Sequence, residues 1–376
     1  MPLDSLEFRT SLQRLLVGLL LILVPVTIFG FYFALQGDSY VRQMNGDHFR
    51  NFTRTSADLT AGFVGQLVKD VGAIANSPSV MRAVTTANRP YERLSEDAIR
   101  NKLDAVENKW NASETDALSR SILTSDLAHE LRRVRELNAN LLKITVGDIN
   151  GAAVAATDRP LHYFQTDPDY RNLLHAEGPG AIQVSDLRYD EQSQLYYLNV
   201  TYPISQEGTG RFIGAVTALV DLTPLFAQLK SQQFGRTGHL FLVRDDGVVI
   251  QAQGVTPGMK IKSEEYAAIR DALGTLRGRE AGYIYSSLPN GERYLLGFAD
   301  AGLRDAYPNL SWTVLASQEE REAVGPIRAV AGFALFMTIM VLLMVTLLGA
   351  YVFLHRKQKL EDIETPPVNN QRSAAA

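Results

Sequence analysis

Two uncharged apolar runs, one near each end of the chain, constrain its fold more than any other feature of the sequence. The first spans residues 15–35 and the second spans residues 329–354. Each exceeds the roughly 20 apolar residues that an α-helix needs to cross the hydrocarbon core of a bilayer. The first run is also longer than the ~7–15 apolar residues at the centre of a signal peptide. We therefore predict two transmembrane helices.

The charges beside these runs predict the side of the membrane on which the termini lie. Arg9 and Arg14 precede the first run, and a basic cluster from His355 to Lys359 follows the second. Segments rich in Lys and Arg stay in the cytoplasm. We therefore expect both termini in the cytoplasm of a bacterium, and residues 36–328 in the periplasm, outside the inner membrane.

Composition and motifs argue against several classes of function. The formal net charge is −4 and the sequence pI is about 5.9, so the chain lacks the basic footprint of a nucleic-acid-binding protein. It has no cysteine, which excludes disulfides and thiol redox sensing. The sequence contains no His-Glu-x-x-His, Gly-x-Ser-x-Gly or Ser-x-x-Lys motif, and its histidines are scattered. We therefore expect no enzyme activity, no metal and no cofactor.

The segment 37–77 has the apolar stripe of a long amphipathic helix. Apolar side chains recur there every three or four residues, which is the helical period. The stripe consists of Leu59, Phe63, Leu67, Val71 and Ile74. Pro78 predicts the end of this helix, because a proline disfavours helical geometry in the residue before it.

A strand pattern occurs twice after this helix. The stretch FLVRDDGVVIQAQ at 241–253 reads as two strands joined by an Asp-Gly turn, and ITVGDINGAAVAAT at 144–157 repeats it. Aligning Val146 with Val243 gives an offset of 97 residues, and the next strand repeats at the same offset. A closing strand that leads into a helix follows in each copy. The repeat predicts two tandem α+β modules, each built on an antiparallel sheet.

The second copy opens with FGRTGHLFLVRDDG at 234–247. This element, the long helix, the two modules and their place between two apolar runs resemble the double Cache sensor domains of bacterial chemoreceptors, sensor kinases and diguanylate cyclases. The resemblance covers about 38–326. It implies an α+β fold with two tandem Cache (PAS-like) modules on antiparallel sheets. It also implies a ligand-binding sensor whose pocket lies in the membrane-distal module, here about 144–222.

One branch of that family binds amino acids and amines through a Tyr, an Arg-x-Trp-Tyr-x-Asp motif and a distant Tyr and Asp. The chain matches this pattern in part. The resemblance places Arg171 at the motif arginine, Tyr189 at the distant tyrosine and Asp221 at the final aspartate, whereas leucines replace the Trp-Tyr pair. The predicted ligand-binding residues are Tyr170, Arg171, Tyr189 and Asp221, with Tyr163 and Tyr202 as further candidates.

Both charged candidates have a structural alternative. Arg171 would hold a ligand carboxylate through its planar guanidinium, or pair on the surface with Asp167 or Asp169. Asp221 would hold a ligand ammonium group, or cap the helix that begins near Thr223. The tyrosines suit a small-molecule pocket because each combines apolar area with a hydroxyl group, and their alternative is packing within the sheet.

These inferences predict the organisation of the chain, from a cytoplasmic N-terminus through a periplasmic sensor to a short cytoplasmic tail. The predicted segments are 1–14 (cytoplasmic), 15–35 (transmembrane), 36–328 (sensor), 329–354 (transmembrane) and 355–376 (cytoplasmic). Within the sensor we expect the long helix at 37–77, the distal module at about 91–230 and the proximal module at about 231–325.

The segment 355–376 is polar and contains a Pro-Pro step, a composition typical of a disordered tail. We therefore expect the sensor to bind an amino acid, an amine or an organic acid and to signal through a separate cytoplasmic protein, as a homodimer formed through the long helix. The alternatives are a cell-envelope enzyme, a stand-alone binding or scaffold protein, and a receptor that has lost its output domain.

Overall fold

The protein is represented by a computed structural model that describes residues 3–112, 117–164, 182–252, 260–275 and 280–364. Its contacts divide the chain into two compact units. The first, the terminal unit, consists of Met1–Asn45 and Glu320–Ala376, and the second, the sensor unit, consists of Gly46–Glu319. Helix α1 (Leu3–Ala75) contributes residues to both.

The terminal unit joins the first part of α1 to the start of α9 (Glu320–Glu364). Arg42 forms an ion pair with the buried Glu320 across 2.5 Å, and the amide of Asn45 donates a hydrogen bond to the carbonyl of Ala323 across 2.7 Å. The two runs predicted to cross a membrane, 15–35 and 329–354, fall within α1 and α9. Across the described residues, no helix combines the length and the apolarity that a membrane crossing requires.

The sensor unit begins with the remainder of α1, which ends at Ala75. Leu67, Val71 and Ile74 of the predicted stripe are buried, and Gly72, on the same stretch of helix, lies against the ring of Tyr202. Gly297 of the second sheet lies against the backbone of Phe49. Shorter helices follow: α2 (Pro78–Asn88), a 3-10 turn (Arg89–Tyr91), α3 (Glu96–Ala112), α4 (Ala117–Thr124) and α5 (Asp126–Leu137).

The first sheet, called the distal sheet after the predicted distal module, has six strands in the order β2-β1-β6-β5-β3, with β4 also paired to β5. All its pairs are antiparallel. Its strands are β1 (Leu141–Asp148), β2 (Ala153–Ala156), β3 (Gln183–Val184), β4 (Arg188–Asp190), β5 (Leu195–Ser205) and β6 (Phe212–Asp221). Helix α7 (Thr223–Ser231) follows β6.

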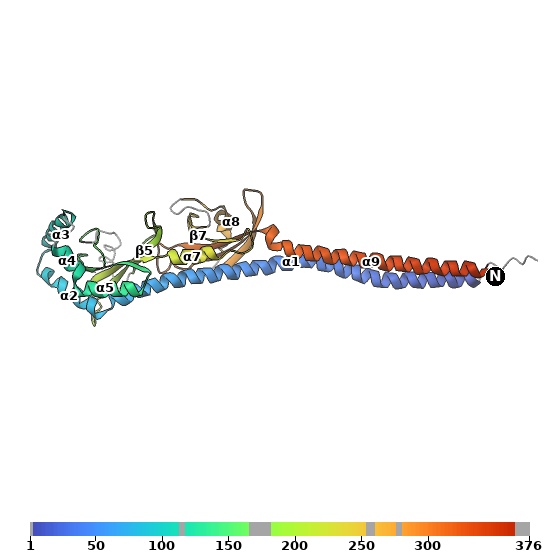
Figure 1. Ribbon diagram of the computed structural model, residues 1–376, viewed down its shortest axis with the longest axis horizontal. Coiled ribbons are helices and arrows are strands. Elements are labelled where there is room, and N and C mark those ends of the chain that lie inside the picture. The colour runs from blue at the N-terminus through green and yellow to red at the C-terminus, as the bar shows by residue number, and fades with distance from the viewer. Residues whose placement is uncertain (1–2, 113–116, 165–181, 253–259, 276–279, 365–376) are drawn as a thin grey trace, which may run out of the picture. The chain divides into compact units, whose positions relative to one another are not determined.

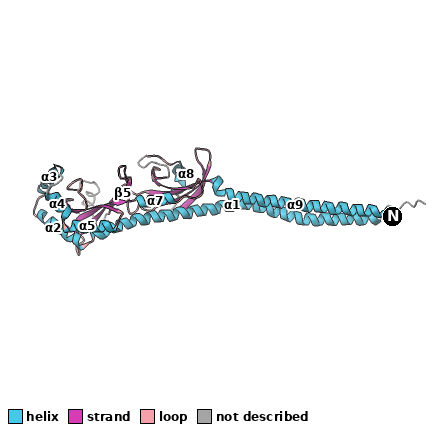
Figure 2. Ribbon diagram, viewed as in Figure 1, coloured by secondary structure: helices cyan, strands magenta, loops and turns pink. Residues whose placement is uncertain are grey.

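The proximal sheet repeats this arrangement in the order β8-β7-β11-β10-β9 (Figure 2). Its strands are β7 (His239–Arg244), β8 (Val249–Gln251), β9 (Ala281–Ser287), β10 (Arg293–Asp300) and β11 (Trp312–Glu319). Helix α8 (Glu264–Leu273) packs on β9 and β10, and Phe241, Ile269, Leu296 and Phe298 are buried in the core between them.

The two sheets correspond strand by strand, except that β4 has no counterpart of its own in the proximal sheet. The hairpin β1–β2 takes the place of β7–β8, β6 that of β11, and β5 that of β10. Figure 1 shows the two sheets in succession, with α7 between them in the chain. The predicted architecture, a long N-terminal helix followed by two antiparallel sheets of α+β type, is therefore confirmed.

Candidate functional site

The distal sheet has two chemically different faces, because successive side chains of a strand point to opposite sides. Leu198 and Val200 on β5, with Val216, Ala218 and Val220 on β6, are completely buried on the face that the helices cover. On the other face, the intervening side chains are only half-buried and more polar. This second face is called the open face below.

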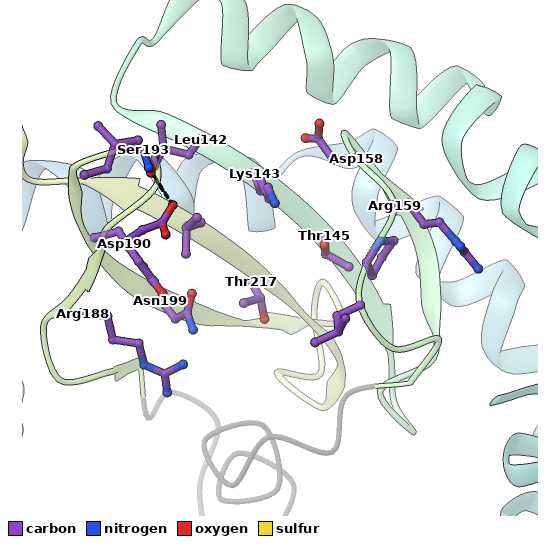
Figure 3. Close-up of a pocket in the computed structure, with 15 residues that line it drawn as sticks. Leu142, Lys143, Thr145, Asp158, Arg159, Arg188, Asp190, Ser193, Asn199 and Thr217 are labelled. Carbon is purple, nitrogen blue, oxygen red and sulfur yellow. Dashed lines mark hydrogen bonds between the residues drawn. The ribbon is translucent and has the colours of Figure 1, made fainter. Parts of the chain in front are cut away.

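A cavity of about 680 Å³ lies on the open face of the distal sheet (Figure 3). This volume falls within the ~300–1,000 Å³ of typical small-molecule sites. Side chains from β1, β4, β5 and β6 line it together with the segment after β2. The lining residues are Leu142, Lys143, Thr145, Asp158, Arg159, Pro160, Leu161, Arg188, Asp190, Ser193, Leu195, Tyr197, Asn199, Thr217 and Leu219.

Two of the cations that line the cavity are available to a ligand. Lys143 lies on β1 and Arg188 lies on β4, and both side chains are exposed. Within the described ranges, neither makes a hydrogen bond or an ion pair with another residue. Arg159 is held differently, because its guanidinium lies 4.6 Å from the centre of the Trp110 ring and donates to the Trp110 carbonyl across 2.6 Å.

Both carboxylates that line the cavity already have donors. Asp158 accepts hydrogen bonds from Arg135 and from the hydroxyl of Thr157, each across 2.7 Å. Asp190 accepts from the Ser193 hydroxyl and from the backbone N–H groups of Gln192 and Ser193. These hydrogen bonds, the Ser193 hydroxyl first, and the charge of Lys143 hold the pKa of Asp190 below its usual value.

Neutral groups complete the lining. Asn199 offers an amide, Tyr197 a phenol, and Thr145 and Thr217 each a hydroxyl. The hydroxyl of Thr217 is also 3.2 Å from that of Thr201 on the neighbouring strand. A few polar groups that converge on a partly apolar cavity are the usual means of orienting a small ligand.

Tyr189, a predicted ligand residue, lies on the helix-covered face. It pairs with Tyr196 across β4 and β5, with the ring centres 4.9 Å apart. Tyr196 in turn meets Phe226 of α7 edge to face at 4.6 Å. Because side chains alternate along a strand, the neighbours of Tyr189, Arg188 and Asp190, reach the cavity instead.

Tyr202 also lies on the helix-covered face. Its ring borders Gly72 of α1, where an added Cβ would lie 2.7 Å from Cε2 of the tyrosine. Tyr163 packs beside Trp110 in a separate cluster with Ile122, with the two ring centres 5.9 Å apart. In the described part of the chain, neither tyrosine is among the residues that line the cavity.

Asp221 ends β6 on the open face, paired in register with Tyr197. Its Oδ1 accepts a hydrogen bond from the backbone N–H of Thr223 across 2.8 Å, at the first residue of α7. Asp221 therefore contacts the start of α7, although the N-cap position itself is Leu222, which makes no side-chain capping bond. The position of Asp221 beside Tyr197 also keeps it next to the cavity, and a role in ligand binding stays a prediction.

Tyr170 and Arg171 lie outside the described residues. The ligand-binding roles of all six predicted residues stay predictions. Sequence reasoning did not single out Lys143, Arg188, Asp190 and Asn199, which the fold brings together around the cavity. The alternation of side chains along the strand means that only one of Tyr196 and Tyr197 can point toward the cavity. The sequence does not show which of the two tyrosines it is.

A deeper titratable group lies at the end of β1, outside the cavity lining. Asp148 is 2% exposed, and its Oδ1 accepts from the N–H groups of Asn150 and Ala152 across 2.8 and 2.9 Å. Burial outweighs these hydrogen bonds and raises the pKa of Asp148 to about 6. The pKa of Tyr163 is raised mainly by the burial of its own phenol and, to a smaller extent, by the negative charge of Asp148.

Three solved structures illustrate the similarity to known proteins. The ligand-binding domain of the Pseudomonas aeruginosa amino-acid chemoreceptor PctC, in complex with GABA, is 15% identical, with a TM-score of 0.45 over 73% of this chain and 99% of that chain. The domain of PctB from the same organism, in complex with L-Arg, is 16% identical, with a TM-score of 0.40 over 74% of this chain and 96% of that chain. The domain of CtaA from Pseudomonas fluorescens, in complex with L-isoleucine, is 12% identical, with a TM-score of 0.44 over 76% of this chain and 97% of that chain.

A search of curated proteins finds no match. The model of the double Cache domain family, in contrast, matches residues 49–327, which include both sheets and most of the sensor part of α1. The match covers well over half of the chain and agrees with the resemblance seen in the sequence. The chain therefore belongs to the Cache domain family of extracytoplasmic sensor domains.

Proposed function

We propose that this protein is a membrane-anchored sensor that binds a small organic molecule in the cavity on the open face of the distal sheet. The observation that carries the proposal is the cavity itself. It has the volume of a small-molecule site, and side chains from four strands of one sheet converge on it. A rigid sheet that presents a few polar groups can hold a ligand in a defined orientation.

Membrane anchoring through residues 15–35 and 329–354 belongs to the proposal. It is supported by large apolar side chains of α9 that are exposed to solvent, which a lipid environment would cover. They include Phe333, Leu335, Phe336, Ile339, Leu343, Met344, Leu347 and Leu348. Basic residues after 354 support a cytoplasmic C-terminus. Fractionation of cells that express the whole chain tests this part, because an anchored protein stays with the membrane after extraction at high pH.

The signalling step requires that a ligand favour one of two states of the receptor, since binding shifts an equilibrium only through a difference in affinity. A separate cytoplasmic signalling protein and a homodimer through α1 remain the predicted partners. Cross-linking in intact cells, followed by identification of the linked chains, tests both. Self-linking through exposed positions of α1 such as Asp58 and Gln66 supports the dimer, and its absence from such positions contradicts it.

Ligand binding is tested by thermal unfolding of the purified whole chain with amino acids, amines, organic acids and purines. A ligand that binds only the folded state stabilises it, by about 2.7 kcal/mol at 100 times its dissociation constant. Thr217→Phe should abolish the stabilisation, because the added ring extends into the cavity. Thr209→Phe, in an exposed turn, is the matched control. Conversion of a stabilising compound into product would favour an enzyme over a sensor.

A further inference from the structure

The cations and the carboxylates around the cavity differ in how many hydrogen-bond partners they already have. The ammonium of Lys143 and the guanidinium of Arg188 reach the cavity without a hydrogen-bond partner among the described residues. The carboxylates of Asp158 and Asp190 already accept two and three hydrogen bonds. A ligand in the cavity therefore meets two cations without hydrogen-bond partners among the described residues, and two carboxylates that already accept hydrogen bonds.

The two cations stand on opposite sides of the cavity. β1 and β4 lie at either side of β6 and β5, in the order β1-β6-β5-β4. Three strand spacings of about 4.8 Å separate their backbones by roughly 14 Å. Figure 3 shows Asn199 between Lys143 and Arg188, and the strand register places Leu219 between Lys143 and Asn199. The long side chains of the two cations can thus approach the two ends of one small molecule.

Neutral groups that can donate hydrogen bonds lie beside the two cations in the cavity lining. Asn199 offers an amide N–H, and Thr145 and Thr217 offer hydroxyls. Hydrogen bonds from such donors and from cations to a carboxylate are stronger than neutral ones. A ligand ammonium group, in contrast, would approach Lys143 or Arg188 and lose its own water without finding an uncommitted carboxylate in the described lining, which is costly.

We infer that the ligand is a small organic dianion, of the class of four- or five-carbon dicarboxylates, with one carboxylate near Lys143 and the other near Arg188. The inference rests on the proposed function and narrows its ligand class from amino acids, amines and organic acids to the last of these. Asp158 and Asp190 are the acids of the described lining. Asp158 is paired with Arg135, and Asp190 accepts three hydrogen bonds from Ser193 and Gln192.

Pairs of compounds that differ in one charged group test the inference. Succinate and 4-aminobutanoate have similar lengths, and so do glutarate and 5-aminopentanoate, but the second member of each pair carries an ammonium group in place of one carboxylate. Binding of each compound to the purified whole chain is measured by calorimetry and by thermal unfolding. We expect one of the dicarboxylates to bind at least tenfold more tightly than its amino counterpart, with an affinity that falls as salt is added.

Variants then locate the two charges. Lys143→Met and Arg188→Met should each weaken dicarboxylate binding more than tenfold and leave the affinity for the amino compound within about threefold. Lys230→Met and Arg211→Met, both at exposed positions outside the cavity lining, are the matched controls and should leave both affinities unchanged. Lys143→Glu should reverse the preference toward the amino compound.

The outcomes separate this inference from the proposed function. An amino compound that binds as tightly as its dicarboxylate partner, or dicarboxylate binding that survives both cavity variants, overturns the inference while the sensor proposal stands. If Thr217→Phe also leaves every stabilisation intact, the cavity is not the binding site and both fail. Absence of stabilisation by any amino acid, amine, organic acid or purine overturns both as well.

Discussion

Arg244 on β7 donates a hydrogen bond to Asp186 across 3.1 Å and so joins the proximal sheet to the segment between β3 and β4 of the distal sheet. The same guanidinium pairs with Asp246 across 2.5 Å. A second contact runs beside it, from the Asn309 amide to the Val184 carbonyl across 2.9 Å. Because Asp186 lies two residues before Arg188, the edge of the cavity is in direct contact with the proximal module.

The contact between Arg244 and Asp186 is expected to contribute little to stability. Their side chains are 33% and 52% exposed, and ion pairs of such exposure are worth about 0.2–1 kcal/mol. A double-mutant cycle with Arg244→Gln and Asp186→Asn, measured by urea unfolding, should give a coupling free energy in this range. The same cycle with Asp246→Asn is the control for the second partner of Arg244. A coupling well above 1 kcal/mol would show that the pair is far better shielded than its exposure indicates.

Gly297 of β10 allows α1 to pack directly on the proximal sheet. A Cβ at this position would lie 2.9 Å from the carbonyl oxygen of Phe49 on α1, so the backbone of one element must move. We expect Gly297→Ala to lower the free energy of unfolding by about 1–3 kcal/mol, the usual cost of overpacking.

Gly65→Ala is the matched control for this substitution. A Cβ at Gly65 of α1 meets nothing within 4 Å, and alanine favours a helix over glycine by about 1 kcal/mol. Denaturant titration should therefore show a gain in stability for Gly65→Ala and a loss for Gly297→Ala. Equal effects of the two changes would contradict the close contact between α1 and β10.

The buried carboxyl of Asp148 predicts a dependence of stability on pH. Its pKa is about 6 in the folded state against an ordinary 3.8, so the folded chain retains a proton between these values that the unfolded chain has released. The free energy of unfolding should therefore fall as pH rises from about 4 to about 6. At about 1.4 kcal/mol per pKa unit, the full loss is on the order of 3 kcal/mol, and it is nearly complete at about pH 7, one unit above the folded pKa.

Asp148→Asn removes this titration while keeping an oxygen that can accept the N–H groups of Asn150 and Ala152. Urea unfolding of the parent and the variant at several pH values between 4 and 7 measures the effect. The stability of the variant relative to the parent should increase by roughly 2.5 kcal/mol across this interval. A constant difference between the two proteins at all pH values would show that Asp148 does not retain its proton in the folded state.

Asp221 can be tested separately as a cap and as a ligand residue. Asp221→Ala should lower the free energy of unfolding by about 1 kcal/mol, because the Thr223 N–H loses its acceptor. Asp221→Asn keeps an acceptor oxygen and should cost less. If Asp221 also contacts a ligand ammonium group, both variants should weaken binding by roughly 1.5–3 kcal/mol, the same loss expected for Arg171→Ala if Arg171 holds a carboxylate. Calorimetry on the stable variants separates the two roles.

The architecture was accessible from local patterns in the sequence. The apolar period of the long helix is a pattern of residues close together in the chain, and so is each strand pattern, which occurs twice at an offset of 97 residues. The structure has the corresponding helix α1 and two sheets of the same strand order. Such signals are local, so they survive without knowledge of the rest of the fold.

The composition of the cavity depended on tertiary structure. Tyr189 was chosen from the sequence, but the pairing of β4 with β5 directs it toward Tyr196 and α7 and turns Arg188 and Asp190 toward the cavity. A shift of one residue along a strand exchanges its two faces, and apolar patterning cannot set that register on a strand of three residues. The sequence alone therefore determined which modules form, whereas strand pairing across residues 143 to 219 decided which side chains meet around the cavity.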